Sequence, residues 1–148
     1  MFKATKLSNY LSIGLLIVVS AWTYSVQAET VALSAHMMGN QEVPAKEGPG
    51  MGTMEGSLNT ETNELKWVVT YSDLSGDVSA AHIHGPAPAG KNAGVAVPFK
   101  GSLVSPITGQ ANIIADQAAD LLAGNWYVNL HTKANPSGEI RGQVQKSK

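Results

Sequence analysis

Four histidines are the residues of this chain whose type and spacing suit metal chemistry. His82 and His84 are separated by one residue, and a strand would place both side chains on one face. Their Cα atoms would then lie ~6.6 Å apart, from which two imidazoles can reach one metal ion at ~2.0 Å. His131 and His36 each end another predicted strand. The sequence therefore predicts a metal site formed by His82, His84 and His131, with His36 or a methionine as a fourth ligand.

The composition restricts which metal this site could hold. The chain has 148 residues and no cysteine, which excludes disulfides, thiolate zinc sites, iron–sulfur clusters and a cysteine nucleophile. Three or four imidazoles without thiolates suit copper(II) or zinc, and we expect copper rather than zinc. Thioethers favour copper(I), although methionines also fill gaps in cores. The methionines that could contribute ligands are Met37, Met38, Met51 and Met54.

The same histidines have a structural interpretation that needs no metal. His82 and His84 could bracket a tight turn and bond to backbone carbonyls, and His131 could hold the loop at residues 132–138. The protein would then be a non-catalytic binding or structural module that contacts a protein or a glycan. No Ser-His-Asp order, phosphate loop or paired-carboxylate cleft stands out, so the sequence does not identify an enzyme.

The first 28 residues have the pattern of a secretory signal peptide. Two lysines near the start precede an apolar run at residues 11–19, and Val26-Gln27-Ala28 provides a small-residue cleavage site. The run is shorter than the ~20 residues that span a bilayer. We therefore expect cleavage, export to the periplasm or the exterior of a bacterial cell, and no later membrane contact. The remaining domain, residues 29–148, keeps 8 of the 10 basic residues against 11 acidic ones. Its net charge of -3 argues against nucleic-acid binding.

Residues 29–148 have the period-two pattern of short strands separated by turns. Pro98 must lie at an edge or a bulge, because it cannot donate a hydrogen bond within a sheet. One short helix is predicted at residues 117–123, with Asp116 as its N-cap and Gly124 after its end. This pattern predicts an all-β, antiparallel Greek-key sandwich of about seven strands with one short helix. The predicted strands are residues 30–36, 51–58, 64–71, 80–84, 94–99, 125–131 and 139–144.

The strand that ends at His131 has two unlike faces. Trp126, Val128 and Leu130 share one face, and we expect them to point into the core. His131 lies on the other, more polar face, where a site could be built.

Three segments, taken together, resemble the chordin domain family, CHRD. The resemblance implies an all-β extracellular domain, which occurs as repeats in animal chordin and as single exported domains in bacteria. This chain resembles the bacterial members. For these, membership of the family predicts the fold better than it predicts the function. It departs from the family pattern at His36-Met37-Met38, where family members commonly have a small polar stretch. The segments are Gly39-Asn40-Gln41-Glu42-Val43-Pro44, Ala81-His82-Ile83-His84-Gly85-Pro86-Ala87, and Tyr127-Val128-Asn129-Leu130-His131 running through Asn135-Pro136-Ser137-Gly138-Glu139-Ile140-Arg141-Gly142.

The chain also has a looser resemblance to copper/zinc superoxide dismutase, an all-β sandwich with an H-x-H strand and a late histidine. The bridging histidine, the zinc-site aspartate and the cysteines of that family are missing. Dismutase activity therefore does not carry over, and a small metalloenzyme is only a third, weaker interpretation.

Overall fold

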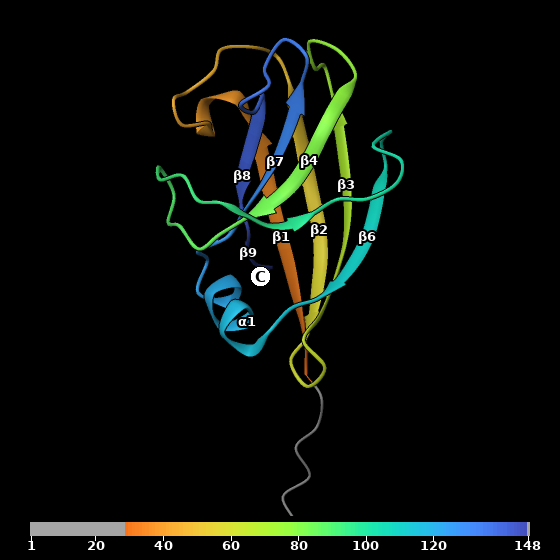
Figure 1. The fold of residues 1–148 in the computed structure, drawn as a ribbon, viewed down its shortest axis with the longest axis vertical. Helices are drawn as coiled ribbons and strands as arrows, with labels where there is room; N and C mark the ends of the chain where they lie inside the picture. Colours follow the sequence, from red (N-terminus) through yellow and green to blue (C-terminus); the bar gives the residue numbers. More distant parts are fainter. Residues whose placement is uncertain (1–28, 148) are drawn as a thin grey trace, which may run out of the picture.

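The computed structural model describes residues 29–147, which form one antiparallel sheet and one α-helix (Figure 1). The predicted signal peptide, residues 1–28, lies outside the described residues. A short 3-10 turn, Gly39–Gln41, follows the first strand, and the helix α1 is Ala115–Leu122. The strands are β1 Thr30–Met38, β2 Met51–Asn59, β3 Glu64–Ser72, β4 Val78–His84, β5 Val95–Pro98, β6 Ile107–Asn112, β7 Tyr127–Thr132, β8 Ile140–Gln143 and β9 Gln145–Lys146.

The strands are hydrogen-bonded in the order β5-β4-β7-β8-β1-β2-β3-β6, and β9 adds to β1. All pairings are antiparallel, and the chain crosses from β3 to β4 without pairing these two strands. The sheet curls until its two halves face each other (Figure 1). Trp67 of β3 stacks on Phe99, just after β5, with ring centroids 4.7 Å apart. The predicted all-β antiparallel fold with one short helix is confirmed.

The core lies between the two halves of the curled sheet. Leu65, Trp67 and Val69, which alternate along β3, are all buried, as the period-two pattern predicts. Trp126 is also buried, and Leu121 attaches α1 to this core. The inner face of the sheet is therefore packed mainly with apolar side chains, and polar side chains that could do chemistry lie on the outer face.

Each predicted strand corresponds to a strand of the structure, but β6 was not predicted. Its sequence, ITGQAN, has one large apolar residue, Ile107, so its alternation is weak. Gly109 of β6 lies against Trp67, and a Cβ at this position would be 2.4 Å from the indole ring. The missing side chain lets β6 pack beside the indole. Pro98 lies in the edge strand β5, as expected.

The predicted helix is present and starts slightly earlier than expected. Its N-cap is Ile114, not Asp116, and the backbone N–H of Ile114 donates to Gln117 Oε1 at 3.1 Å. Asp116 lies in the first turn, where its charge favours the helix dipole. Gly124 follows the helix with φ of 78°, the left-handed conformation predicted for it. Within residues 29–147, no helix has the length and apolar character needed to cross a membrane.

Candidate metal centre

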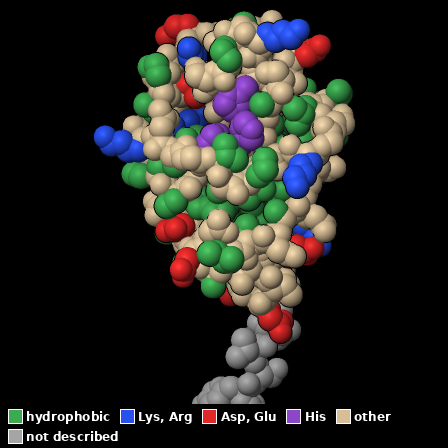
Figure 2. Space-filling model, in the orientation of Figure 1, with side chains coloured by type: hydrophobic (Ala, Val, Ile, Leu, Met, Phe, Trp, Pro, Cys, Tyr) green, Lys and Arg blue, Asp and Glu red, His purple; other side chains and the backbone are tan. Residues whose placement is uncertain are grey.

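Three of the four histidines meet on the outer face of the sheet. His82 and His84 belong to β4, and His131 belongs to β7, its direct neighbour. Ile83 and Val128, which alternate with them, are completely buried in the core. The histidines therefore point away from the core, as the two-faced pattern predicts, and histidine side chains gather on one part of the surface (Figure 2). We call His82, His84 and His131 the histidine centre.

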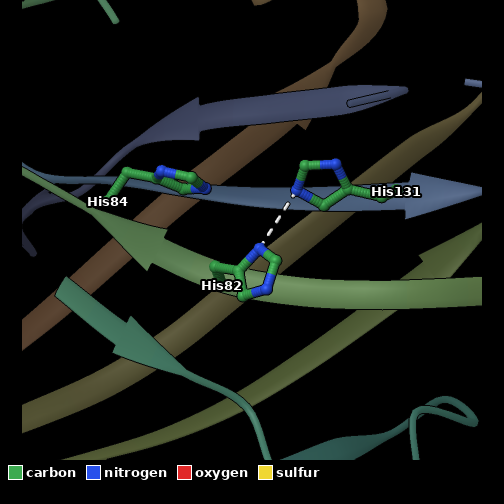
Figure 3. A group of neighbouring side chains, drawn as sticks. All are labelled: His82, His84 and His131. Atoms are coloured by element: carbon green, nitrogen blue, oxygen red, sulfur yellow. Dashed lines mark hydrogen bonds between the residues drawn. The ribbon is translucent and has the colours of Figure 1, made fainter. Parts of the chain in front are cut away.

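The three rings point toward one another (Figure 3). Nδ1 of His82 lies 3.2 Å from Nε2 of His131. One nitrogen from each ring can be chosen so that all three lie within 4.8 Å of one another. Three atoms within 4.8 Å of one another share a central point that is at most about 2.8 Å from each, compared with a metal–imidazole bond of ~2.0 Å. Sub-ångström movements of the rings would bring all three nitrogens to one metal ion, so the cluster could bind a metal.

Backbone hydrogen bonds fix which nitrogen two of the histidines present. The Nδ1 N–H of His84 donates to the carbonyl of Ala93, and that of His131 donates to the carbonyl of Pro136, each at 3.1 Å. Because a carbonyl only accepts, both Nδ1 atoms carry the proton and both Nε2 atoms carry the lone pair. The bonds to backbone carbonyls expected from the structural interpretation are therefore present at His84 and His131. Metal-binding histidines ordinarily make the same kind of hydrogen bond, in which the ring nitrogen that does not bind the metal donates to a carbonyl or a carboxylate.

Nε2 of His84 is buried and has no hydrogen-bond partner within residues 29–147. Leaving a buried polar atom unpaired costs about 1–3 kcal/mol. No protein group in the described chain offsets this cost. A metal ion between the three rings would supply the missing partner, so the residues present fit a metal.

Burial keeps the three imidazoles neutral. It lowers the pKa of His82, which the neighbouring His131 and His84 lower further. Burial also lowers the pKa of His84 and that of His131, although their backbone hydrogen bonds partly oppose the shift. All three rings therefore titrate below the ordinary histidine range and are neutral at pH 7. The neutral ring is the form that binds metals.

A stack of side chains holds the ring of His84. Tyr127 is parallel to it, with ring centroids 4.9 Å apart and an angle of 2°. The guanidinium of Arg141 lies over the Tyr127 ring, 3.5 Å from its centroid. The hydroxyl of Tyr127 donates to the carbonyl of Ala93 and accepts from its N–H, at 3.2 and 3.1 Å. The carbonyl that orients His84 is thus itself held in place.

Arg141 also ties the loop after β4 to the sheet. Its side chain is almost fully buried and donates to Asn92 Oδ1 at 3.0 Å and to the carbonyl of Lys91 at 2.7 Å. Asn92 in turn donates to the carbonyl of Val43 at 2.9 Å. The loop that contains Ala93 is therefore anchored at several points.

A buried carboxylate lies next to this network. Asn129, on the same face of β7 as His131, donates to Glu42 and to the carbonyl of Ile140. Burial raises the pKa of Glu42 to about 7, although the bond from Asn129 and the charge of Arg141 oppose the shift. Sequence reasoning did not assign a role to Glu42. Its position in the Gln-Glu-Val-Pro segment was the available signal.

His36 and the methionines lie elsewhere. His36 is exposed on β1, which β7 and β8 separate from β4, about 14 Å along the sheet. The structure does not bring this predicted fourth ligand to the histidine centre. Met37 and Met54 are completely buried in the core, which matches the gap-filling alternative. Met38 and Met51 are 43% and 55% exposed.

A family model described as the CHRD domain matches residues 33–144. The chain belongs to the CHRD domain family. No curated protein and no solved structure matches it. The segments that resemble CHRD supply His82, His84 and His131, together with Glu42 and Arg141 beside them. Parts of all three segments that resemble the family therefore lie in or beside the histidine centre.

Proposed function

We propose that this CHRD-domain protein binds one copper(II) ion through Nδ1 of His82 and Nε2 of His84 and His131. The unpaired, buried Nε2 of His84 carries the proposal, because it faces two further imidazoles and has no protein partner in the described chain. Copper would take the place of the proton between His82 and His131, and His82 would then carry its proton on Nε2.

The ligand set supports copper over zinc. Affinity of a nitrogen site for divalent first-row metals is highest for copper(II), and imidazole suits both ions. The chain has no cysteine that would favour zinc. His82 and His84 are only partly buried, so a fourth position is open to water or another small ligand. We propose in addition that the protein works outside the cytoplasm, which the signal-peptide pattern of residues 1–28 supports.

Copper titration of the purified protein and of two histidine variants tests the proposal. His82→Ala is the cleanest loss of a ligand, because His84 and His131 also hold backbone carbonyls. We expect one copper(II) per chain, bound at least about 100-fold more weakly by His82→Ala. The matched control, His36→Ala, should bind as the unchanged protein does. Absence of stoichiometric binding, or equal binding by His82→Ala, would overturn the proposal.

The second candidate is a non-catalytic module whose histidines are structural and which contacts a protein or a glycan. The bonds from His84 to Ala93 and from His131 to Pro136 favour it, because each pins a loop without a metal. Under this function, His84→Ala lowers the melting temperature equally with and without a chelator. Under the copper function, the chelator lowers the melting temperature of the unchanged protein but lowers that of His84→Ala little further, because the substitution has already removed a ligand.

A further inference from the structure

A second group of metal-ligating side chains lies outside the histidine centre, in an open pocket of about 780 Å³. One wall is the outer face of β1, β2 and β3 near the loop that joins β1 to β2. The other wall is part of that loop, residues 46–50, drawn in orange to gold at the top of Figure 1. The pocket is lined by His36, Met38 and Met51, which we call the methionine patch.

The strand register places the two methionines side by side. Met38 of β1 and Met51 of β2 are direct partners in the antiparallel pair. Side chains of such partners lie on the same face, with Cβ atoms about 4.5–5.5 Å apart. Both are exposed, at 43% and 55%, whereas Met37 and Met54 point into the core and are completely buried. The exposed thioethers are thus a feature of this face and not of the core.

His36 completes the group. It lies two residues before Met38 on the same face of β1, about 6.6 Å away along the strand. Methionine has three rotatable side-chain bonds, so both sulfur atoms can move toward one imidazole. One imidazole and two thioethers can therefore meet at a single ion within the pocket.

The donors and the charge of the pocket select a soft, monovalent ion. Thioethers are soft ligands that select copper(I), and the chain has no thiolate to compete with them. Lys46 and Glu47 are the charged residues that line the pocket, so it has no net formal charge. A monovalent ion loses less hydration free energy than a divalent one on entering such a site. We propose that His36, Met38 and Met51 form a second metal site, specific for copper(I) and independent of the histidine centre.

Silver(I) tests this site directly, because it is a soft monovalent ion that air does not oxidise. The purified protein, labelled with ¹³C in its methionine methyl groups, is titrated with silver(I) and followed by NMR. We expect the Met38 and Met51 methyl signals to shift together at one equivalent. The signal of Met54, buried in the core, is the internal control and should not move. Unmoved Met38 and Met51 signals would overturn the proposal.

Conservative substitutions distinguish whether the methionine patch is a metal site or only an apolar surface. Met38→Leu combined with Met51→Leu keeps the apolar character of the patch and removes both sulfur atoms, at exposed positions that do not endanger the fold. Silver(I) should then bind at this patch at least about 100-fold more weakly, and the His36 ring signals should no longer respond. In His82→Ala with His84→Ala, the methionine shifts should persist. Equal binding by the leucine variant, or loss of the methionine shifts without His82 and His84, would contradict the second site.

Discussion

The histidine centre and the methionine patch differ in how firmly the protein holds their side chains. In the centre, His84 and His131 each donate to a backbone carbonyl, and Tyr127 stacks on His84. In the patch, His36 is exposed and its companions are flexible thioethers. Histidine content alone therefore does not show how a site binds its ion. Anchored rings present their lone pairs in one arrangement, whereas the patch must gather its ligands around the ion.

The largest expected difference between the two regions is the stabilisation that copper(II) provides. A ligand at 1,000 times its Kd stabilises the folded state by about 4.1 kcal/mol. Thermal unfolding with and without copper(II) should show this gain in the unchanged protein and in His36→Ala. His82→Ala, which binds at least about 100-fold more weakly, should gain no more than about 1.4 kcal/mol at the same copper concentration. Equal gains in His82→Ala and the unchanged protein would place copper outside the histidine centre.

The two regions also differ in a buried carboxylate: Glu42 lies next to the network around the histidine centre and is not part of the methionine patch. Its pKa is about 7 in the folded protein, above its ordinary value of 4.5, so the folded state binds more protons between these limits. The stability this group contributes is fully present below pH 4.5 and is lost as the pH rises through 7. Glu42→Gln should therefore unfold less readily than the unchanged protein at pH 8, by up to about 3 kcal/mol. The two should be nearly equal at pH 4. Denaturant unfolding at both pH values measures this, and an equal difference at both would refute the assignment.

The pH dependence of copper(II) binding reports on the neutral rings of the centre. The pKa values of His82, His84 and His131 are lowered, so protons compete with copper only below the ordinary histidine pKa of ~6.5. Affinity should be flat from pH 8 to 7, and between pH 7 and 5.5 it should fall less than it would for three imidazoles with the ordinary pKa. Titrations across this range measure it. A steep loss that begins above pH 7 would be inconsistent with the buried, neutral rings.

The smallest expected effect concerns the support of His84. Tyr127→Phe removes the hydroxyl that holds Ala93 and should cost about 1 kcal/mol of stability and about tenfold in copper(II) affinity. Tyr71→Phe is the matched control, because the Tyr71 hydroxyl donates to the carbonyl of Leu103, away from the centre. It should cost similar stability and leave copper affinity unchanged. Equal copper affinities in the two variants would show that the Tyr127 hydroxyl does not support the centre.

Local pattern was enough to predict the strands and their faces. The alternation of Leu65, Trp67 and Val69 predicted a buried face, and the spacing of His82 and His84 predicted that their rings share a face. Both follow from the two-residue period of a strand. The strand β6 was missed because ITGQAN has little alternation, and it forms by pairing with β3 beside Trp67.

The assembly of the site depended on pairing between distant parts of the chain. Nothing local in the sequence shows that β4 pairs with β7 while β1 lies beyond β8. For this reason His36 was a candidate for the fourth ligand beside His82, His84 and His131, although only these three form the histidine centre. The proton positions set by Ala93 and Pro136 were equally hidden, because they depend on how the loops fold back over the rings.

A crystal structure of the copper-loaded protein, with the ion located by anomalous scattering at the copper edge, tests most directly whether the histidine centre binds copper(II). We expect a copper(II) peak about 2.0 Å from Nδ1 of His82 and from Nε2 of His84 and His131. A fully loaded crystal with no peak between these three rings, or with its copper(II) bound only at His36, would contradict it.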